Sequence, residues 1–137
     1  STTALNLVGA TVVVDGSTTQ LTGGKATWSL NVTKPATATV TIKDATGQTA
    51  YTGSFAVTPG TQNFVWDGHG INGTMWPDGA YTMMATATDA SGQTTAISTQ
   101  IQARVDSVDL TQTPPLLSIG GQNYTVNQLQ KIVAPAN

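Results

Sequence analysis

The sequence predicts an all-β protein in which a β-sandwich is inserted into a small, discontinuous β-barrel. Apolar and polar side chains alternate with period two through the middle of the chain, as in half-buried strands. Asp, Gly and Pro residues separate these runs at the short spacing typical of sandwiches, and no 3.6-residue helical periodicity occurs between residues 26 and 103. We expect residues 25–103 to form the sandwich, and residues 1–24 and 104–137 to form the barrel.

The composition limits the classes of partner. Charged residues make up 9% of the chain, far below the roughly 25% usual in soluble domains, and the net charge is −2. No basic patch is present, which argues against nucleic acid and anionic membranes as partners. No apolar run approaches the ~18 residues that a membrane span needs, so we expect no membrane insertion. Cysteine is absent, which excludes disulfides and thiolate metal sites. Because the sequence lacks an initiator Met, we expect a fragment of a longer protein.

The first element is predicted as a strand over residues 7–14, rich in Val. Asp15-Gly16 follows at once, and this dipeptide between two strand-like runs predicts a hairpin that returns through residues 17–21. Gly23-Gly24 then breaks the pattern.

The sandwich is predicted from runs with alternating apolar residues or strong strand propensity. These runs cover residues 26–33, 36–43, 49–57, 61–66, 81–87 and 95–103. Residues 44–48 and 89–93 have nearly the same sequence, with Asp first and Gly fourth, which suits a type I turn followed by a bulge. About seven short strands at this spacing are typical of an immunoglobulin-like or fibronectin type III-like sandwich.

The last third predicts strands over residues 105–110 and 116–119, a tight turn at Gly120-Gly121, and a return strand to Val126. Asn127 is expected to cap one helical turn from Gln128 to Ile132. Neither end segment has enough apolar surface to fold alone, but together they supply the strands of a tudor- or SH3-like barrel. We expect hinge freedom between the two parts near Gly23-Gly24 and Ala103-Arg104.

The stretch from Phe64 to Tyr81 is the candidate functional region. It is predicted as two strand ends joined by a loop of glycines and a proline, and a loop of this length usually folds on itself or makes a contact. The structural motif comprises Trp66, Asp67, Gly68, Gly73, Pro77, Asp78, Gly79 and Tyr81. Trp76 is the candidate partner contact, because an exposed Trp can bind a protein or a sugar; the alternative is that its ring folds onto the sandwich edge.

No catalytic, cofactor or metal site is predicted. His69 is the single histidine, and no Ser-His-Asp spacing or close carboxylate pair is evident. Asp67, His69 and Asn72 loosely resemble a calcium loop, but the repeating Asp/Asn register is wrong and no Glu closes it. Asp67 is expected to accept a hydrogen bond from its own loop backbone as an Asx turn.

Several segments together resemble the C-terminal region of the bacterial flagellar hook-capping protein family, also called the hook assembly or basal-body rod modification protein. They are residues 42–47, 64–68, Gly73, 77–81, 89–92 and 105–108. Gly70 departs from the family, which often has a carboxylate there. The resemblance implies a tudor-like barrel with a fibronectin type III-like insertion. It also implies a non-enzymatic scaffold, exported by the flagellar type III route, that sits at the distal end of the growing hook, associates with itself as a cap and helps hook subunits polymerise.

Two other classes of protein are alternatives to the scaffold hypothesis. A carbohydrate-binding or adhesin module would use Trp76 as its platform. A hydrolase accessory domain would need paired catalytic acid and base residues, and the sequence shows no such pair.

Overall fold

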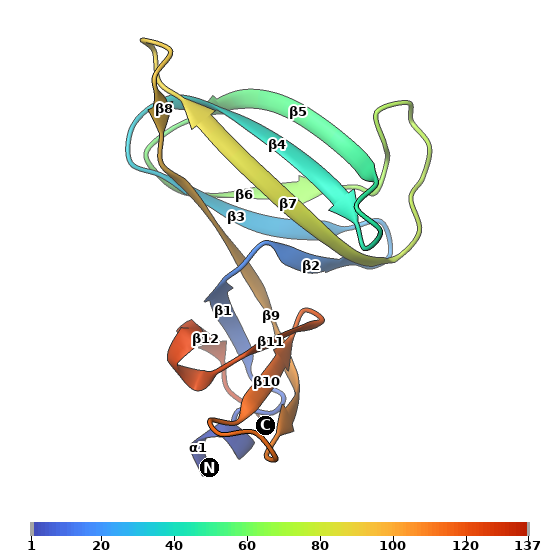
Figure 1. The fold of residues 1–137 in the computed structure, drawn as a ribbon, viewed down its shortest axis with the longest axis vertical. Coiled ribbons are helices and arrows are strands. Elements are labelled where there is room, and N and C mark those ends of the chain that lie inside the picture. Colours follow the sequence, from blue (N-terminus) through green and yellow to red (C-terminus); the bar gives the residue numbers. More distant parts are fainter. Residues whose placement is uncertain (1, 137) are drawn as a thin grey trace.

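The computed structural model describes residues 2–136 and consists mainly of strands in two sheets (Figure 1). The elements are α1 (Thr2–Leu5), β1 (Thr11–Asp15), β2 (Thr18–Leu21), β3 (Ala26–Val32), β4 (Ala36–Asp44), β5 (Thr49–Val57), β6 (Gly60–Trp66), β7 (Gly79–Thr88), β8 (Thr94–Thr95), β9 (Ile97–Asp109), β10 (Leu116–Ile119), β11 (Gln122–Tyr124), the 3₁₀-helix η1 (Val126–Gln128) and β12 (Leu129–Ala134). Within residues 2–136, helices are too short to cross a bilayer. The all-β prediction is confirmed.

Strands β2–β8 and the first part of β9 form a sandwich, which we call the sandwich unit. One of its layers has the order β2-β7-β4-β5, with β8 also on β7, and the other contains β6, β3 and β9. The alternation predicted for residues 26–33 is visible in β3, where every second residue from Ala26 to Val32 is buried. Trp28 is fully buried between the layers. The period-2 pattern therefore identified the core face correctly.

The remaining elements form what we call the terminal unit: α1, β1, the second part of β9, β10, β11, η1 and β12, in the strand order β11-β10-β9-β1-β12. The long strand β9 passes through both units (Figure 1). It pairs with β3 over residues 97–100, with β1 over residues 100–104 and with β10 from residue 105 onward. Ala103-Arg104 therefore lies inside a continuous ladder with β1 instead of in a loose connection.

Three predictions for the chain's ends are wrong. Residues 7–9 lie in helical turns after α1, where Leu7 N–H donates to the Ala4 carbonyl, so the strand begins only at Thr11. The predicted return segment, residues 17–21, pairs with β7 instead of β1. The predicted helical turn at Gln128–Ile132 is largely strand β12, because η1 begins earlier, with Thr125 as its N-cap residue.

The Asp15-Gly16 hairpin fails because long-range hydrogen bonds hold this segment extended. Gly16 N–H donates to the Thr99 carbonyl, while the Ser17 carbonyl accepts from Trp28 Nε1 at 2.7 Å and from Met83 N–H at 2.8 Å. The chain thus crosses from β1 into the sandwich unit.

As a result β2, which the predicted division places in the barrel range 1–24, pairs within the sandwich. Gly23-Gly24 sits in the β2–β3 turn of that unit, away from the crossing. Residues 1 and 137 of the predicted ranges lie outside the described part.

The two Asp-x-x-Gly turns have the same geometry, as their sequences predict. Asp44 Oδ1 accepts hydrogen bonds from Thr46 N–H, Thr46 Oγ1 and Gln48 N–H at 3.0, 2.7 and 2.9 Å. Asp89 Oδ1 accepts the equivalent three bonds, from Ser91 N–H, Ser91 Oγ and the N–H of residue 93. The hydroxyl bond from Thr46 or Ser91 is the main cause that lowers the pKa of each carboxyl group below its ordinary value.

Candidate functional site

The candidate site is the loop of residues 67–78 that joins β6 to β7, which we call the β6–β7 loop. The loop folds back on itself through backbone bonds: Trp76 N–H donates to the Gly68 carbonyl at 2.7 Å, and Gly70 N–H donates to the Thr74 carbonyl at 2.8 Å. An isolated β-bridge links residues 69 and 75. Because these bonds cross the loop, they hold it in one conformation and present its tip as a preformed surface.

Two buried aromatic side chains support the base of the loop. Trp66 and Tyr81 are each 2% exposed, and their rings meet edge to face with centroids 5.0 Å apart. Trp66 Nε1 donates to the His69 carbonyl at 2.9 Å, and the Tyr81 hydroxyl donates to the Pro77 carbonyl at 2.6 Å. Burial raises the pKa of the Tyr81 hydroxyl further above neutral pH, so the protonated hydroxyl remains the donor. Each ring thus fixes one arm of the loop through its polar atom.

Asp67 forms the Asx turn that the sequence predicts. Its Oδ1 accepts from His69 N–H at 2.9 Å, and this backbone bond is the largest cause that lowers the pKa of the Asp67 carboxyl group. The exposed His69 Nδ1 lies 3.4 Å from Asp67 Oδ2. Asn72 makes a second turn of the same kind, accepting from Thr74 N–H at 3.1 Å. Among residues 2–136, three or more His, Asp, Cys or Glu side chains are nowhere grouped so that they could hold a metal ion.

The glycines Gly68 and Gly70 allow the close packing of the loop. Gly68 has φ +84°, and a Cβ there would meet Leu21 and Met75 at 3.2 Å. A Cβ on Gly70 would lie 2.5 Å from Trp76 Nε1 and 3.0 Å from the Ala50 carbonyl oxygen. A carboxylate side chain at position 70 therefore has no room while the Trp76 ring occupies this place.

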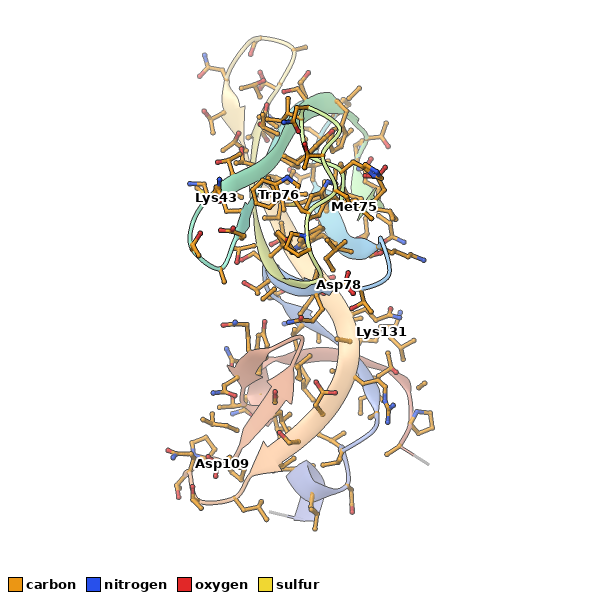
Figure 2. All side chains as sticks on the ribbon, turned by 90° about the vertical axis from the view of Figure 1, so that its right-hand side faces the viewer. Lys43, Met75, Trp76, Asp78, Asp109 and Lys131 are labelled. Atoms are coloured by element: carbon orange, nitrogen blue, oxygen red, sulfur yellow. The ribbon has the colours of Figure 1, made fainter. Side chains whose placement is uncertain are left out.

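The remaining motif residues lie around the same loop. Gly73 and Gly79 both have positive φ, with no atom near the place of a Cβ. Asp78 Oδ2 accepts a weak, exposed bond of 3.4 Å from Gly23 N–H, which connects the loop to the β2–β3 turn. The structure therefore brings all eight motif residues together at one end of the sandwich unit, which Figure 2 views directly.

Trp76 packs against the sandwich instead of standing free. Its side chain is half-buried, and its ring contacts the Tyr81 ring edge to face at 6.5 Å. The exposed apolar side chains of the loop are Ile71, 69% exposed, and Met75, 54% exposed. A shallow hollow of about 220 Å³ lies beside Ile71 and is lined in part by Trp76. Ile71 and Met75 were not predicted as site residues; the signal that could have identified them is a large apolar residue on each side of the Asn72-Gly73 turn.

The fold is similar to solved FlgD structures. FlgD from P. aeruginosa superposes with a TM-score of 0.78 at 26% identity, over 92% of this chain and 97% of that one. FlgD from Xanthomonas campestris gives a TM-score of 0.75 at 27% identity, over 92% and 94%; its structure is described as giving insight into hook capping essential for flagellar assembly. A truncated FlgD from Helicobacter pylori, 20% identical with a TM-score of 0.53 over 96% and 97%, shares the fold.

No curated protein matches the sequence. The family model of the FlgD Ig-like domain matches residues 16–91, a span that contains β2 to β7 and the whole β6–β7 loop. Since this span is more than half of the chain, the protein belongs to the FlgD family.

Proposed function

We propose that this chain is a non-enzymatic scaffold of the flagellar hook cap, which binds hook subunits at the distal end of the growing hook and aids their polymerisation. Family membership carries the proposal, since the P. aeruginosa and X. campestris proteins match nearly the whole chain. The proposal includes export through the flagellar type III route and self-association of the protein into a cap.

The proposed architecture is a fibronectin type III-like sandwich inserted into a tudor-like barrel. The pairing of β2 with β7 supports an insertion that starts near Gly16 instead of residue 25, and the family match also begins at residue 16. The five strands of the terminal unit support the barrel. In this division β9 leaves the sandwich near Gln100, the residue that pairs with both Ser29 and Asp15.

Within this function, the tip of the β6–β7 loop is proposed as a contact for hook subunits. Ile71 and Met75 offer apolar area on a loop whose backbone is already ordered, so binding costs little conformational entropy. Trp76 supports this surface from below through its contact with Tyr81. Two exposed aliphatic side chains make a small contact, which suits a scaffold that must release each subunit.

Hook assembly in a flagellated bacterium tests the proposal. The protein would carry Ile71→Ser with Met75→Ser, and hooks would be counted and measured by electron microscopy. Met84→Ser is the matched control, because Met84 is 57% exposed but lies on β7 away from the loop. We expect fewer or shorter hooks with the loop variant and normal hooks with Met84→Ser.

Deletion of the gene segment that encodes residues 1–137 separates the role of the loop from the wider role of the chain. Normal hooks after this deletion would refute the scaffold function. Normal hooks with the loop variant alone would refute only the proposed contact at Ile71 and Met75.

A further inference from the structure

The β10–β11 turn of the terminal unit packs directly on β2 of the sandwich unit. Gln20 Nε2 donates to the Gly120 carbonyl oxygen at 3.3 Å across the junction of the units. The place of a Cβ on Gly120 lies 3.4 Å from the Thr18 carbonyl oxygen. In Figure 1 the tip of the β10–β11 hairpin points toward β2. Contact between the units is therefore not confined to the two chain crossings.

This contact depends on two adjacent residues without side chains. A Cβ on Gly120 would come within 2.9 Å of Ile101 Cδ1, and Ile101 is a core residue only 1% exposed. A Cβ on Gly121 would come within 2.7 Å of Gln20 Nε2, the atom that makes the bond across the junction. Real Cβ atoms do not approach other atoms this closely, so a side chain at either position must displace part of the junction.

Further contacts hold the same junction from its other sides. A Cβ on Gly16 would lie 2.5 Å from the Tyr124 hydroxyl, so the ring lies against the chain where it crosses between the units. Asp15 accepts hydrogen bonds from Gln100 Nε2 at 3.0 Å and from Gln130 Nε2 at 3.2 Å. One hydrophobic cluster also runs through both units, and its members include Trp28, Leu30, Val14, Ile101, Leu117 and Ile119.

We propose that the Gly120-Gly121 turn is a latch that fixes the angle between the sandwich unit and the terminal unit, so that the chain moves as one rigid body. The latch makes β9 a stiff connection. The close packing of Gly120 on β2 opposes bending of β9 toward β2, and the bond from Gln20 to the Gly120 carbonyl opposes bending away from it. The proposal is independent of the hook-cap function. It replaces the hinge that the sequence suggested near Gly23-Gly24 and Ala103-Arg104.

The chain provides matched controls for the latch. Gly120 and Gly23 have φ of +60° and +59°, and Gly121 and Gly92 have φ of +84° and +83°. Gly23 and Gly92 have no atom within 4 Å of the place of a Cβ. Alanine meets nearly the same positive φ within each pair, so the two members of a pair differ chiefly in the contact that a Cβ makes at the junction.

Residual dipolar couplings of backbone amides measure the angle and its rigidity. In the wild-type chain we expect one alignment tensor to fit both units. In Gly120→Ala we expect the tensors of the two units to differ in orientation or magnitude, and in Gly23→Ala we expect a single tensor. Gly121→Ala should show a smaller separation than Gly120→Ala, since only the flexible end of Gln20 must move, and Gly92→Ala should show none.

Three results would overturn the latch. The first is a wild-type chain whose units already need two tensors. The second is one common tensor in Gly121→Ala and in Gly120→Ala. The third is equal separation in Gly23→Ala and Gly120→Ala. If Gly120→Ala does not fold, comparison of Gly121→Ala with Gly92→Ala decides the question, because Gly121 meets no backbone or core atom within 4 Å.

Discussion

Replacing Tyr81 with Phe tests whether the Tyr81 hydroxyl holds the β6–β7 loop in place. The substitution keeps the buried ring, its 5.0 Å contact with Trp66 and its 6.5 Å contact with Trp76, and removes only the hydrogen bond to the Pro77 carbonyl. A bond of this kind contributes about 1 kcal/mol net to the free energy of unfolding. For a chain of this size that loss lowers Tm by roughly 3–4 °C. Tyr81→Ala also removes the buried ring and should cost about 3–5 kcal/mol.

Urea unfolding followed by circular dichroism gives the global free energy, and amide hydrogen exchange at Gly70 and Trp76 reports the loop. We expect Tyr81→Phe to speed exchange at both amides while strand amides of β4 change only by the global loss. Tyr51→Phe is the control, because among residues 2–136 the structure gives the Tyr51 hydroxyl no hydrogen-bond partner, and we expect it to be neutral within about 0.5 kcal/mol. A Tyr81→Phe loss as large as that of Tyr81→Ala, or no change in loop exchange, would refute the reasoning.

Two further predictions concern the loop packing and the turns. Gly70→Ala should destabilise the chain by about 1–3 kcal/mol, because its methyl group must displace Trp76 or the Ala50 carbonyl. Adding Trp76→Leu should restore part of this loss, as measured by urea unfolding. If stability does not recover, the steric clash with Trp76 is not the cause. Asp44 and Asp89 have folded-state pKa values below the ordinary value, so their contribution to stability is complete above pH ~4 and is lost as pH falls through the folded-state values. The urea midpoint of unfolding should therefore decrease as the pH is lowered below about 4. The Asp44→Asn/Asp89→Asn variant should show a smaller decrease. A midpoint that rises on acidification would contradict the assignment.

The sandwich strands could be predicted because their signals are local. In β3 each buried residue is apolar and each intervening residue is Thr, Ser or Asn, so the period-2 rule applies without knowledge of the partners. The turns after β4 and β7 could be predicted for the same reason, since the hydrogen bonds to each Asp side chain come from within the five residues 44–48 or 89–93. For these elements, residues that are close together in the sequence are enough to specify the local structure.

Residues 15–21 could not be predicted in this way because their partners are distant in the sequence. Asp-Gly has a local preference for a hairpin, but a type I′ turn needs positive φ at both residues, and neither Asp15 nor Gly16 has it here. Asp15 instead stays in the ladder with Gln100. Ser17 accepts bonds from residues 28 and 83. Several long-range bonds together outweigh one turn preference, and no local pattern reveals them.

The two ends of the β6–β7 loop can be placed from the sequence, but the side chains that its tip exposes cannot. The role of Trp66 and Tyr81 as buried supports follows from their places at the strand ends, whereas the exposure of Trp76 depends on how the loop closes. In the loop that the Trp76 N–H bond to the Gly68 carbonyl closes, the indole ring lies beside Gly70, and Met75 lies against Gly68 with about half of its surface exposed. The sequence alone does not distinguish between neighbouring apolar residues of a loop when the bonds that close the loop decide which one faces the core.

The proposed scaffold function has two opposed requirements: recognition of each subunit and its ready release. A rigid loop meets the first, because the bonds within it and the rings of Trp66 and Tyr81 order it before any partner arrives. A small apolar tip, Ile71 and Met75, on a surface with few charges meets the second, because little area is buried and no strong ion pair must be broken. If the latch holds as well, the terminal unit and this tip keep a fixed separation. Contacts made at both ends of the molecule would then depend on that geometry, so loosening Gly120 should impair assembly even though Gly120 lies far along the chain from the loop.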